Sequence, residues 1–434
     1  FAYSTHQLNA EVLRQDASSA AICKPVQQQQ TQQQAQQAPF YVQLDTQVVW
    51  QHHDAASISR GFPANLLIRA SPPIRIDNAV PADIIVSIVD ADLGVVIESD
   101  TVLEGASRCF FHADVSRRLM LSIQVPSLRL VCAKMARITL AGQSLAMLGG
   151  AVELVSDSET TPAAARQTVR LNLHNAVLPG HRSSRVIGVY APIVLVNKTA
   201  LPLQFRQAGG LSSGPSATTS ASASTLLSVA SEDDAARSAS TNEVLAQTAV
   251  QLFSFRSSSV APRLAVRVSG QTQYSAGFGI AAGSTGEAQL KGVSGAGGVQ
   301  LGVAMRLGSG RFFRSKVITF SPRFVIANRT GYALEVRAAD SETAAALLVD
   351  NDARLPFHFD AKSRLVRVRL HRVFAGGDGG AWSVPFGVND VGDVFVRTPD
   401  PDTTGGSRSV LLRARIALEG ATLFVLLTVW ARGA

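Results

Sequence analysis

An internal repeat constrains the fold of this chain more than any other feature. A proline, a short apolar strand, an asparagine that opens a turn and a second strand recur at 71–81, 191–202 and 321–331. An aromatic segment follows each copy, at 109–112, 252–255 and 355–359, and then an alternating strand at 118–123, 263–268 and 364–369. The period of about 120 to 130 residues exceeds that of solenoid repeats and suits whole β-sandwiches of roughly 100 residues.

The rest of the pattern predicts an all-β chain. Apolar or alternating runs such as 84–89 are bounded by Gly, Pro, Asp and Asn, which is the signature of strands and turns. We therefore expect tandem antiparallel β-sandwich repeats with disordered insertions. The expected domains are 62–187, 188–316 and 317–434, and whether the third is complete is left open. Residues 1–61 are interpreted as part of a preceding repeat, with a closing strand near Phe40 to Leu44, and a disordered Gln-rich segment.

Two segments are of low complexity. Gln27 to Gln37 is mostly glutamine, and Gly209 to Asn242 is rich in Ser, Ala, Thr and Gly with three acidic residues at 232–234. Neither can bury a core, so both are predicted to be disordered. The second is interpreted as a loop insertion, because it accounts for the longer spacing between Asn197 and Phe253 than in the other copies. Glycine clusters at 295–298 and 376–380 are predicted hairpin tips.

The charge pattern argues against a nucleic-acid site. The net charge is +8, but the arginines alternate with apolar residues, as at 263–268 and 364–369, and do not cluster in runs. We expect them on the outer faces of strands. Three cysteines among 434 residues give neither a disulfide framework nor a metal quartet, which favours a reducing compartment. The longest apolar run, 423–430, is far shorter than the roughly 20 residues of a membrane helix.

No set of residues predicts catalysis. His52 and His53 have no carboxylate or cysteine partner at metal-ligand spacing. Asp90 and Asp92 follow a strand and are expected in a turn, while Cys109 beside two phenylalanines is expected to be a buried thiol. There is no phosphate-binding or dinucleotide-binding glycine loop. We therefore expect neither an enzyme nor a cofactor.

Specific stretches resemble a known family. Segment 192–203, Pro-Ile-Val-Leu-Val-Asn-Lys-Thr-Ala-Leu-Pro-Leu, and segment 317–330 are similar to successive units of the adaptor-binding region of the vacuolar protein sorting-13 family. An aromatic-Ser-x-x-Phe element shared by Tyr274–Phe278 and Trp382–Phe386 fits the same pattern, although the first repeat has no clear copy. The resemblance covers most of 62–434 and is strongest over 188–397.

The resemblance implies a function. Full-length members are rod-like, bridge-like lipid transfer proteins at membrane contact sites, and their adaptor-binding region has about six β-sandwich repeats with an asparagine near the start of each. It implies a cytoplasmic protein that is peripheral at organelle membranes and binds adaptors carrying Pro-x-Pro-type motifs. The matching asparagines here are Asn78, Asn197 and Asn328, which are our candidate binding residues.

Alternatives remain for these asparagines. Each is suited to turn chemistry, because Asn hydrogen-bonds its own backbone, and a buried Asn can also satisfy unpaired backbone groups. Direct contact with a peptide is the second interpretation. Glycosylation is a third, since Asn197 and Asn328, but not Asn78, begin Asn-x-Thr sequons.

Edge strands could pair with an extended, proline-containing peptide, with Phe205, Tyr190 or Phe324 as candidates to contact its prolines or, alternatively, as core residues. Adaptor docking is thus our first functional hypothesis. The second is a structural spacer that braces the lipid conduit and binds no peptide, and the third is an extracellular adhesion array. Glycans on Asn197 and Asn328 would favour the third, and peptide binding separates the first from the second.

Overall fold

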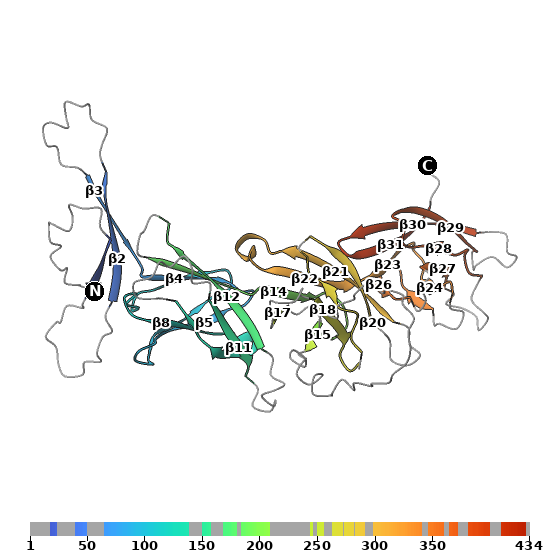
Figure 1. The fold of residues 1–434 in the computed structure, drawn as a ribbon. Coiled ribbons are helices and arrows are strands. Elements are labelled where there is room, and N and C mark those ends of the chain that lie inside the picture. Colours follow the sequence, from blue (N-terminus) through green and yellow to red (C-terminus); the bar gives the residue numbers. More distant parts are fainter. Residues whose placement is uncertain are drawn as a thin grey trace, which may run out of the picture. The chain divides into compact units, whose positions relative to one another are not determined.

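A computed structural model describes much of the chain. It covers residues 18–23, 40–49, 65–138, 150–157, 168–179, 184–208, 244–245, 250–255, 263–271, 273–281, 283–290, 298–340, 346–359, 364–371, 381–399 and 409–430. Across these residues the structure is all-β, as predicted, and the helical turns it contains are the 3₁₀ turns η2 (Pro126–Leu128) and η5 (Gly310–Phe312). Figure 1 shows strands along the whole described chain. The Gln-rich segment, the Ser/Ala-rich insertion at 209–242 and the glycine tip at 376–380 lie outside the described residues, as does most of the tip at 295–298.

The chain divides into two compact units. The first comprises Phe1–Ile193, Leu252–Ser254 and Gly308–Ser315, and the second comprises Val194–Gln251, Phe255–Leu307 and Lys316–Ala434.

The first unit holds one β-sandwich, called the first sandwich, and a small additional sheet. The additional sheet has the order β1-β2-β3, and the sandwich consists of the sheets β10-β8-β5-β6 and β7-β4-β13-β12-β11-β9. The strands are β1 (Ser18–Cys23), β2 (Phe40–Val49), β3 (Asn65–Ser71), β4 (Ile74–Ala79), β5 (Ile84–Asp90), β6 (Val96–Val102), β7 (Ser107–Phe110), β8 (Leu119–Gln124), β9 (Leu130–Lys134), β10 (Ala136–Arg137), β11 (Ala151–Ser156), β12 (Thr168–Val177) and β13 (Arg185–Tyr190).

Alternation of apolar and polar residues decides which side of each strand faces the core. In β4, Ile74 and Ile76 are fully buried while Arg75 and Asp77 between them are not. A period of two places alternate side chains on opposite faces of a sheet, so one face of each strand packs inward. Tyr41 N–H donates to the carbonyl oxygen of Phe111 at 2.7 Å, which attaches β2 to the end of β7.

The second unit contains most of the remaining strands, which form the second and third sandwiches. The second sandwich has the sheets β17-β14-β22-β21-β20 and β16-β15-β18-β19, and the third has β26-β23-β31-β30-β29 and β25-β24-β27-β28. The strands of the second are β14 (Ile193–Asn197), β15 (Leu203–Ala208), β16 (Val244–Leu245), β17 (Val250–Phe253), β18 (Arg263–Val268), β19 (Phe278–Gly279), β20 (Thr285–Leu290), β21 (Val299–Leu307) and β22 (Lys316–Pro322). Those of the third are β23 (Phe324–Arg329), β24 (Leu334–Ala338), β25 (Leu347–Val349), β26 (Arg354–Phe357), β27 (Leu365–Leu370), β28 (Phe386–Gly387), β29 (Gly392–Pro399), β30 (Ser409–Glu419) and β31 (Thr422–Val429).

The last strand of a sandwich returns beside its first. β13 pairs in parallel with β4, and β31 pairs in parallel with β23, while the other strand pairs within these sandwiches are antiparallel over the described residues. In the third sandwich, one core cluster joins both sheets and includes Phe324, Val336 and Val425. The predicted domain limit at 187/188 falls within β13, and the limit at 316/317 falls at the start of β22. The division into three domains at those limits stays a prediction.

The shared aromatic-Ser-x-x-Phe element has a structural explanation. Ser275 N–H donates to the carbonyl oxygen of Val266 at 2.8 Å, and Ser275 Oγ accepts the N–H of Val266 at 3.1 Å. Ser383 makes the same pair of bonds with Val368, at 2.9 and 3.1 Å. The serine side chain therefore completes the edge of the sheet where the backbone turns away. The aromatic residue before each serine stacks on two arginines of that sheet: Arg206 and Arg267 beside Tyr274, and Arg337 and Arg369 beside Trp382.

Candidate functional site

The three candidate asparagines occupy equivalent positions inside the fold. Asn78 lies near the end of β4, Asn197 ends β14 and Asn328 lies near the end of β23. Their exposed fractions are 1%, 0% and 0%. Since an amide in such a place needs partners for both its oxygen and its nitrogen, the surrounding backbone determines what it does.

Asn78 links β4, the first strand of the first sandwich, to the edge strand β6. Its Nδ2 donates to the carbonyl oxygens of Ala82, Val102 and Leu103 at 2.9, 3.0 and 3.1 Å. Its Oδ1 accepts the N–H of Val80 at 2.9 Å. The side chain thus closes the turn after β4 and fixes the end of β6.

Asn328 and Asn197 repeat this arrangement with a threonine added. Asn328 Nδ2 donates to the carbonyl oxygens of Tyr332 and Val349 at 2.7 and 2.8 Å, and its Oδ1 accepts the N–H and Oγ1–H of Thr330 at 3.1 and 2.8 Å. Asn197 bonds Leu201 and Thr199 in the same way. The threonines of the two sequons therefore complete a buried turn, and neither amide nitrogen is accessible to a glycan in the folded chain.

The aromatic candidates have mixed positions. Phe205 and Phe324 are both 1% exposed, so they belong to the core. Phe205 packs against Phe320, with ring centroids 4.8 Å apart. Tyr190 is half-buried at the end of β13. None of the three lines the shallow pocket beside the edge strand β6.

A shallow apolar pocket lies beside the edge strand β6 in the first unit. Its volume is about 180 Å³, well below the roughly 300–1,000 Å³ of sites that enclose whole small molecules. It is lined by Tyr41, Asp90, Leu93, Val95, Val96, Ile97, His112, Asp114 and Arg117. Leu93, Val95 and Val96 are 65%, 54% and 58% exposed, which is unusual for neighbouring apolar side chains. The pocket therefore suits a small apolar side chain of another molecule.

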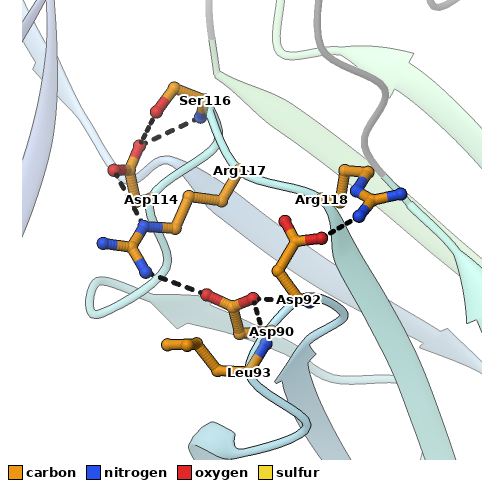
Figure 2. A network of polar contacts seen from close by, with 7 residues as sticks. All are labelled: Asp90, Asp92, Leu93, Asp114, Ser116, Arg117 and Arg118. Carbon is orange, nitrogen blue, oxygen red and sulfur yellow. Dashed lines mark hydrogen bonds and ion pairs between the residues drawn. The ribbon is translucent and has the colours of Figure 1, made fainter.

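A polar network holds the turn that forms the rim of this pocket (Figure 2). The carboxylate of Asp90 accepts the N–H groups of Asp92 and Leu93 at 2.9 and 3.2 Å, and the guanidinium of Arg117 at 3.0 Å. The hydrogen bond from Arg117 holds the pKa of the Asp90 carboxyl below its ordinary range; burial opposes this shift, and the two N–H groups add to it. The expected turn at Asp90 and Asp92 is confirmed, and its charges are paired.

Two further ion pairs stabilise the network. Arg118 binds Asp92, and Asp114 receives the hydroxyl of Ser116 at 2.6 Å while lying 3.7 Å from Arg117 Nε. Because the carboxylates and guanidiniums neutralise one another, the rim presents its apolar side chains and little net charge.

Acid should weaken this network. Because the pKa of Asp90 is lowered in the folded chain, its contribution to stability is present above the unfolded pKa of about 3.9 and is lost as the pH falls through the lower folded pKa. We expect Arg117→Gln to melt at a lower temperature than the native chain at about pH 7, and the difference to shrink as the pH falls below the unfolded pKa of about 3.9. Calorimetry across this range measures the difference. Arg137→Gln, a change at an exposed arginine, is the control, and a pH-independent gap for Arg117→Gln contradicts the expectation.

Other chemistries find little support in the described residues. Within the described ranges, no group of three or more His, Cys, Asp and Glu residues could hold a metal ion. Burial raises the pKa of the Cys109 thiol, which opposes a role as a nucleophile. His52 and His53 lie outside the described residues. No helix in the described part of the chain is long and apolar enough to cross a membrane.

The pocket was missed by the sequence reasoning. The signal available was the run Leu93-Gly94-Val95-Val96, three apolar residues in a turn where polar residues are usual. Apolar residues in such a run are assigned to a core when only the sequence is considered. Their exposure becomes evident once β6 is known to lie at the edge of its sheet.

Comparisons with known proteins agree on one family. The family model described as "Vacuolar-sorting associated protein 13, adaptor binding domain" matches residues 13–431. "Intermembrane lipid transfer protein VPS13" of Chaetomium thermophilum is 25% identical over 388 residues, which is 89% of this chain. "Intermembrane lipid transfer protein Vps13D" of Drosophila melanogaster is 21% identical over 370 residues, or 82% of this chain. The chain spans only 11% and 8% of the lengths of these two relatives.

Proposed function

The chain belongs to the adaptor binding domain family of vacuolar-sorting associated protein 13, and from this premise we propose that it docks adaptor proteins by binding short Pro-x-Pro-type segments along β6. The observation that carries the proposal is the pocket at the start of this edge strand, with Leu93, Val95 and Val96 each more than half exposed. Docking is proposed in place of catalysis, and it requires no cofactor and no nucleic acid.

Strand geometry explains why a Pro-x-Pro segment suits an edge strand. In an added strand, the N–H groups of alternate residues point toward the sheet, and those of the residues between them point away. Two prolines separated by one residue can therefore both occupy the positions that need no N–H, while the middle residue bonds to β6. Their rings then project onto the same face, where the pocket contributes apolar contacts.

Asn78 supports the same strand from inside. Its Nδ2 bonds to the carbonyl oxygens of Val102 and Leu103, which fixes the far end of β6, while the Asp90 network fixes the turn before it. We assign Asn78 to positioning, because a buried amide with all its partners satisfied must leave its turn to reach a peptide. Asn197 and Asn328 are proposed to hold the corresponding turns of the other two sandwiches.

The alternative is a spacer that braces the longer protein. Hydrogen bonds between buried groups favour it: Gln300 Nε2 donates to the carbonyl oxygen of Phe359 at 2.9 Å, and Gln300 Oε1 accepts the N–H of Phe359 at 3.3 Å. These bonds fix the third sandwich to the second within the second unit. A docking region also needs a rigid array, so only peptide binding distinguishes the docking function from the spacer function.

The role of the whole protein is a further part of the proposal. The named relatives are intermembrane lipid transfer proteins. We infer that the adaptors bring such a protein to organelle membrane contact sites from the cytoplasm, so that this chain associates with membranes only indirectly.

Hydrogen exchange followed by NMR locates the proposed interface. Saturation with a Pro-x-Pro peptide should slow exchange of the β6 amides that β5 leaves unpaired, because the added strand accepts their hydrogens. The amides of β29, an edge strand of the third sandwich, are the internal control. Protection confined to another edge would move the site, and no protection at saturating peptide would favour the spacer.

A further inference from the structure

The outer face of the sheet β25-β24-β27-β28 in the third sandwich carries a group of arginines. In β24 and β27 every second residue is buried in the core, so the residues between them point outward. The charged residues that point outward from these two strands are Glu335, Arg337, Arg367 and Arg369. Three guanidiniums and one carboxylate leave this face with an excess of positive charge.

The carboxylate on these two strands is engaged by residues other than the pair Arg337 and Arg367. Glu335 Oε2 accepts Nε–H of Arg369 at 2.7 Å and lies 2.6 Å from its Nη2. Glu335 Oε1 lies 2.6 Å from Nδ1 of His371. Both carboxylate oxygens therefore have partners, and Glu335 does not neutralise the charges of Arg337 and Arg367.

Arg337 and Arg367 lie directly opposite each other. The antiparallel register of β24 and β27 pairs them, which places their Cβ atoms about 4.5–5.5 Å apart. Like charges at such positions destabilise a sheet. Over the described residues neither arginine forms an ion pair, and the Nε atom of each is buried without a hydrogen-bond partner. An anion bound between the two guanidiniums would remove this repulsion.

Trp382 orients one member of the pair. The guanidinium carbon of Arg337 lies 4.3 Å from the centre of the Trp382 ring, and that of Arg369 lies 4.5 Å from it. A guanidinium that stacks on an aromatic ring keeps its N–H groups in its own plane, where they remain available to a ligand. The stacking of Arg337 thus reduces the entropy that an anion-binding site would lose on binding.

The other two sandwiches have different residues at the positions of this pair. When the three candidate asparagines are aligned, Arg337 corresponds to Ser87 in the first sandwich and to Arg206 in the second. The residue opposite is Ser122 in the first sandwich and Ala265 in the second. The opposed arginines are therefore not required by the fold that the sandwiches share, and they call for an explanation specific to the third.

We propose that Arg337 and Arg367 bind the phosphoryl group of a phosphorylated serine or threonine in an extended segment of a partner protein. A phosphoryl group carries a charge of about −1.5 to −2 at pH 7 and three acceptor oxygens, so it can neutralise and bond both guanidiniums. A carboxylate carries a single charge and leaves the pair partly uncompensated. The site lies in the second unit and β6 lies in the first, so the proposal does not rest on docking at β6.

Exposed apolar side chains beside the arginines favour a peptide as the carrier of the phosphoryl group. Leu365 of β27 and Leu348 of β25 point to the same face and are 38% and 43% exposed. They would contact apolar residues next to the phosphorylated one. A membrane fits this face less well, because polybasic membrane sites carry about four to eight Lys and Arg residues. Trp382 is also half-buried beneath two guanidiniums and cannot insert into a bilayer.

Fluorescence anisotropy with a labelled peptide library tests this proposal. Each peptide has one phosphothreonine at its centre and degenerate residues at all other positions. We expect saturable binding by the native chain and affinity at least about tenfold lower for Arg367→Gln, which loses a charge-assisted contact. Arg206→Gln removes the corresponding arginine of the second sandwich and should leave the affinity unchanged. Because Arg367→Gln relieves repulsion, it should melt no lower than the native chain, which excludes unfolding as the cause.

Three outcomes overturn the proposal. No saturable binding by the folded native chain, or equal affinities of the native chain and Arg367→Gln, would mean that the arginine pair binds no phosphorylated peptide. Equal binding of a library with aspartate in place of phosphothreonine would mean that the site recognises a carboxylate. Sedimentation with vesicles of phosphatidylcholine and phosphatidylinositol 4-phosphate, lost in Arg367→Gln and unaccompanied by peptide binding, would identify a membrane as the partner.

Discussion

Replacing Asn328 with alanine should destabilise the third sandwich by about 3 kcal/mol, because a buried backbone group left unsatisfied costs roughly 1–3 kcal/mol and several lose their partner. The carbonyl oxygens of Tyr332 and Val349 lose their donor, and the N–H of Thr330 loses its acceptor. Asn328→Asp should destabilise more, since it keeps an acceptor for Thr330 but turns a carboxylate oxygen toward two carbonyl oxygens.

Urea unfolding followed by tryptophan fluorescence measures this effect, because Trp382 and Trp430 both belong to the third sandwich. The control is Asn389→Ala, an exposed asparagine of the same sandwich, which should change stability by less than about 0.5 kcal/mol. If Asn328→Ala proves as mild as the control, the asparagine does not hold the turn, and a role in direct peptide contact gains weight.

Alternating and β-branched runs in the sequence were sufficient to predict several of the strands. The predicted strand at 263–268 is β18, and the strands predicted at 84–89 and 364–369 match β5 and β27 to within one residue at each end. Prediction succeeded there because burial on one face of a strand requires alternation, which can be seen in the sequence itself. The arginines at 367 and 369 alternate with the buried Val366 and Val368, as expected for outward-facing side chains.

The asparagine turns were predictable in kind but not in detail. Turn chemistry follows from the residue type, whereas the bond from Asn78 to Val102, 24 residues away, depends on the path of the edge strand. The threonines illustrate the same limit. A sequon and a buried Asn-Thr pair have the same sequence, and burial alone distinguishes them.

Exposed apolar residues were the hardest to predict. Val96, Phe395 and Trp430 lie in strand patterns that fit a core as well as a surface. What distinguishes them is the position of their strands in the sheets, which depends on pairing between strands that are far apart in the sequence. No local pattern carries that information.

Substituting Val96 with aspartate should abolish most of the peptide binding proposed for this chain. Val96 lines the pocket and begins β6, so a carboxylate there would have to be desolvated beneath the peptide. Loss of an apolar anchor at the centre of an interface costs about 2 kcal/mol or more, which is roughly a thirtyfold increase in Kd. Since the side chain is 58% exposed, the fold should tolerate the change.

A matched pair of controls separates the pocket from general effects. Val391→Asp alters a valine that is 65% exposed in the third sandwich and should leave the affinity unchanged. A peptide with both prolines replaced by alanine should bind the native chain weakly, because an unconstrained segment loses more entropy on ordering and fills the pocket less well.

The measurement that tests adaptor docking most directly is a fluorescence-anisotropy titration of the native chain, Val96→Asp and Val391→Asp with a short fluorescein-labelled Pro-x-Pro peptide. We expect saturable binding by the native chain and by Val391→Asp, with loss of about thirtyfold in affinity for Val96→Asp. Absence of saturable binding by the folded native chain, or equal affinities of all three proteins, would contradict docking at β6.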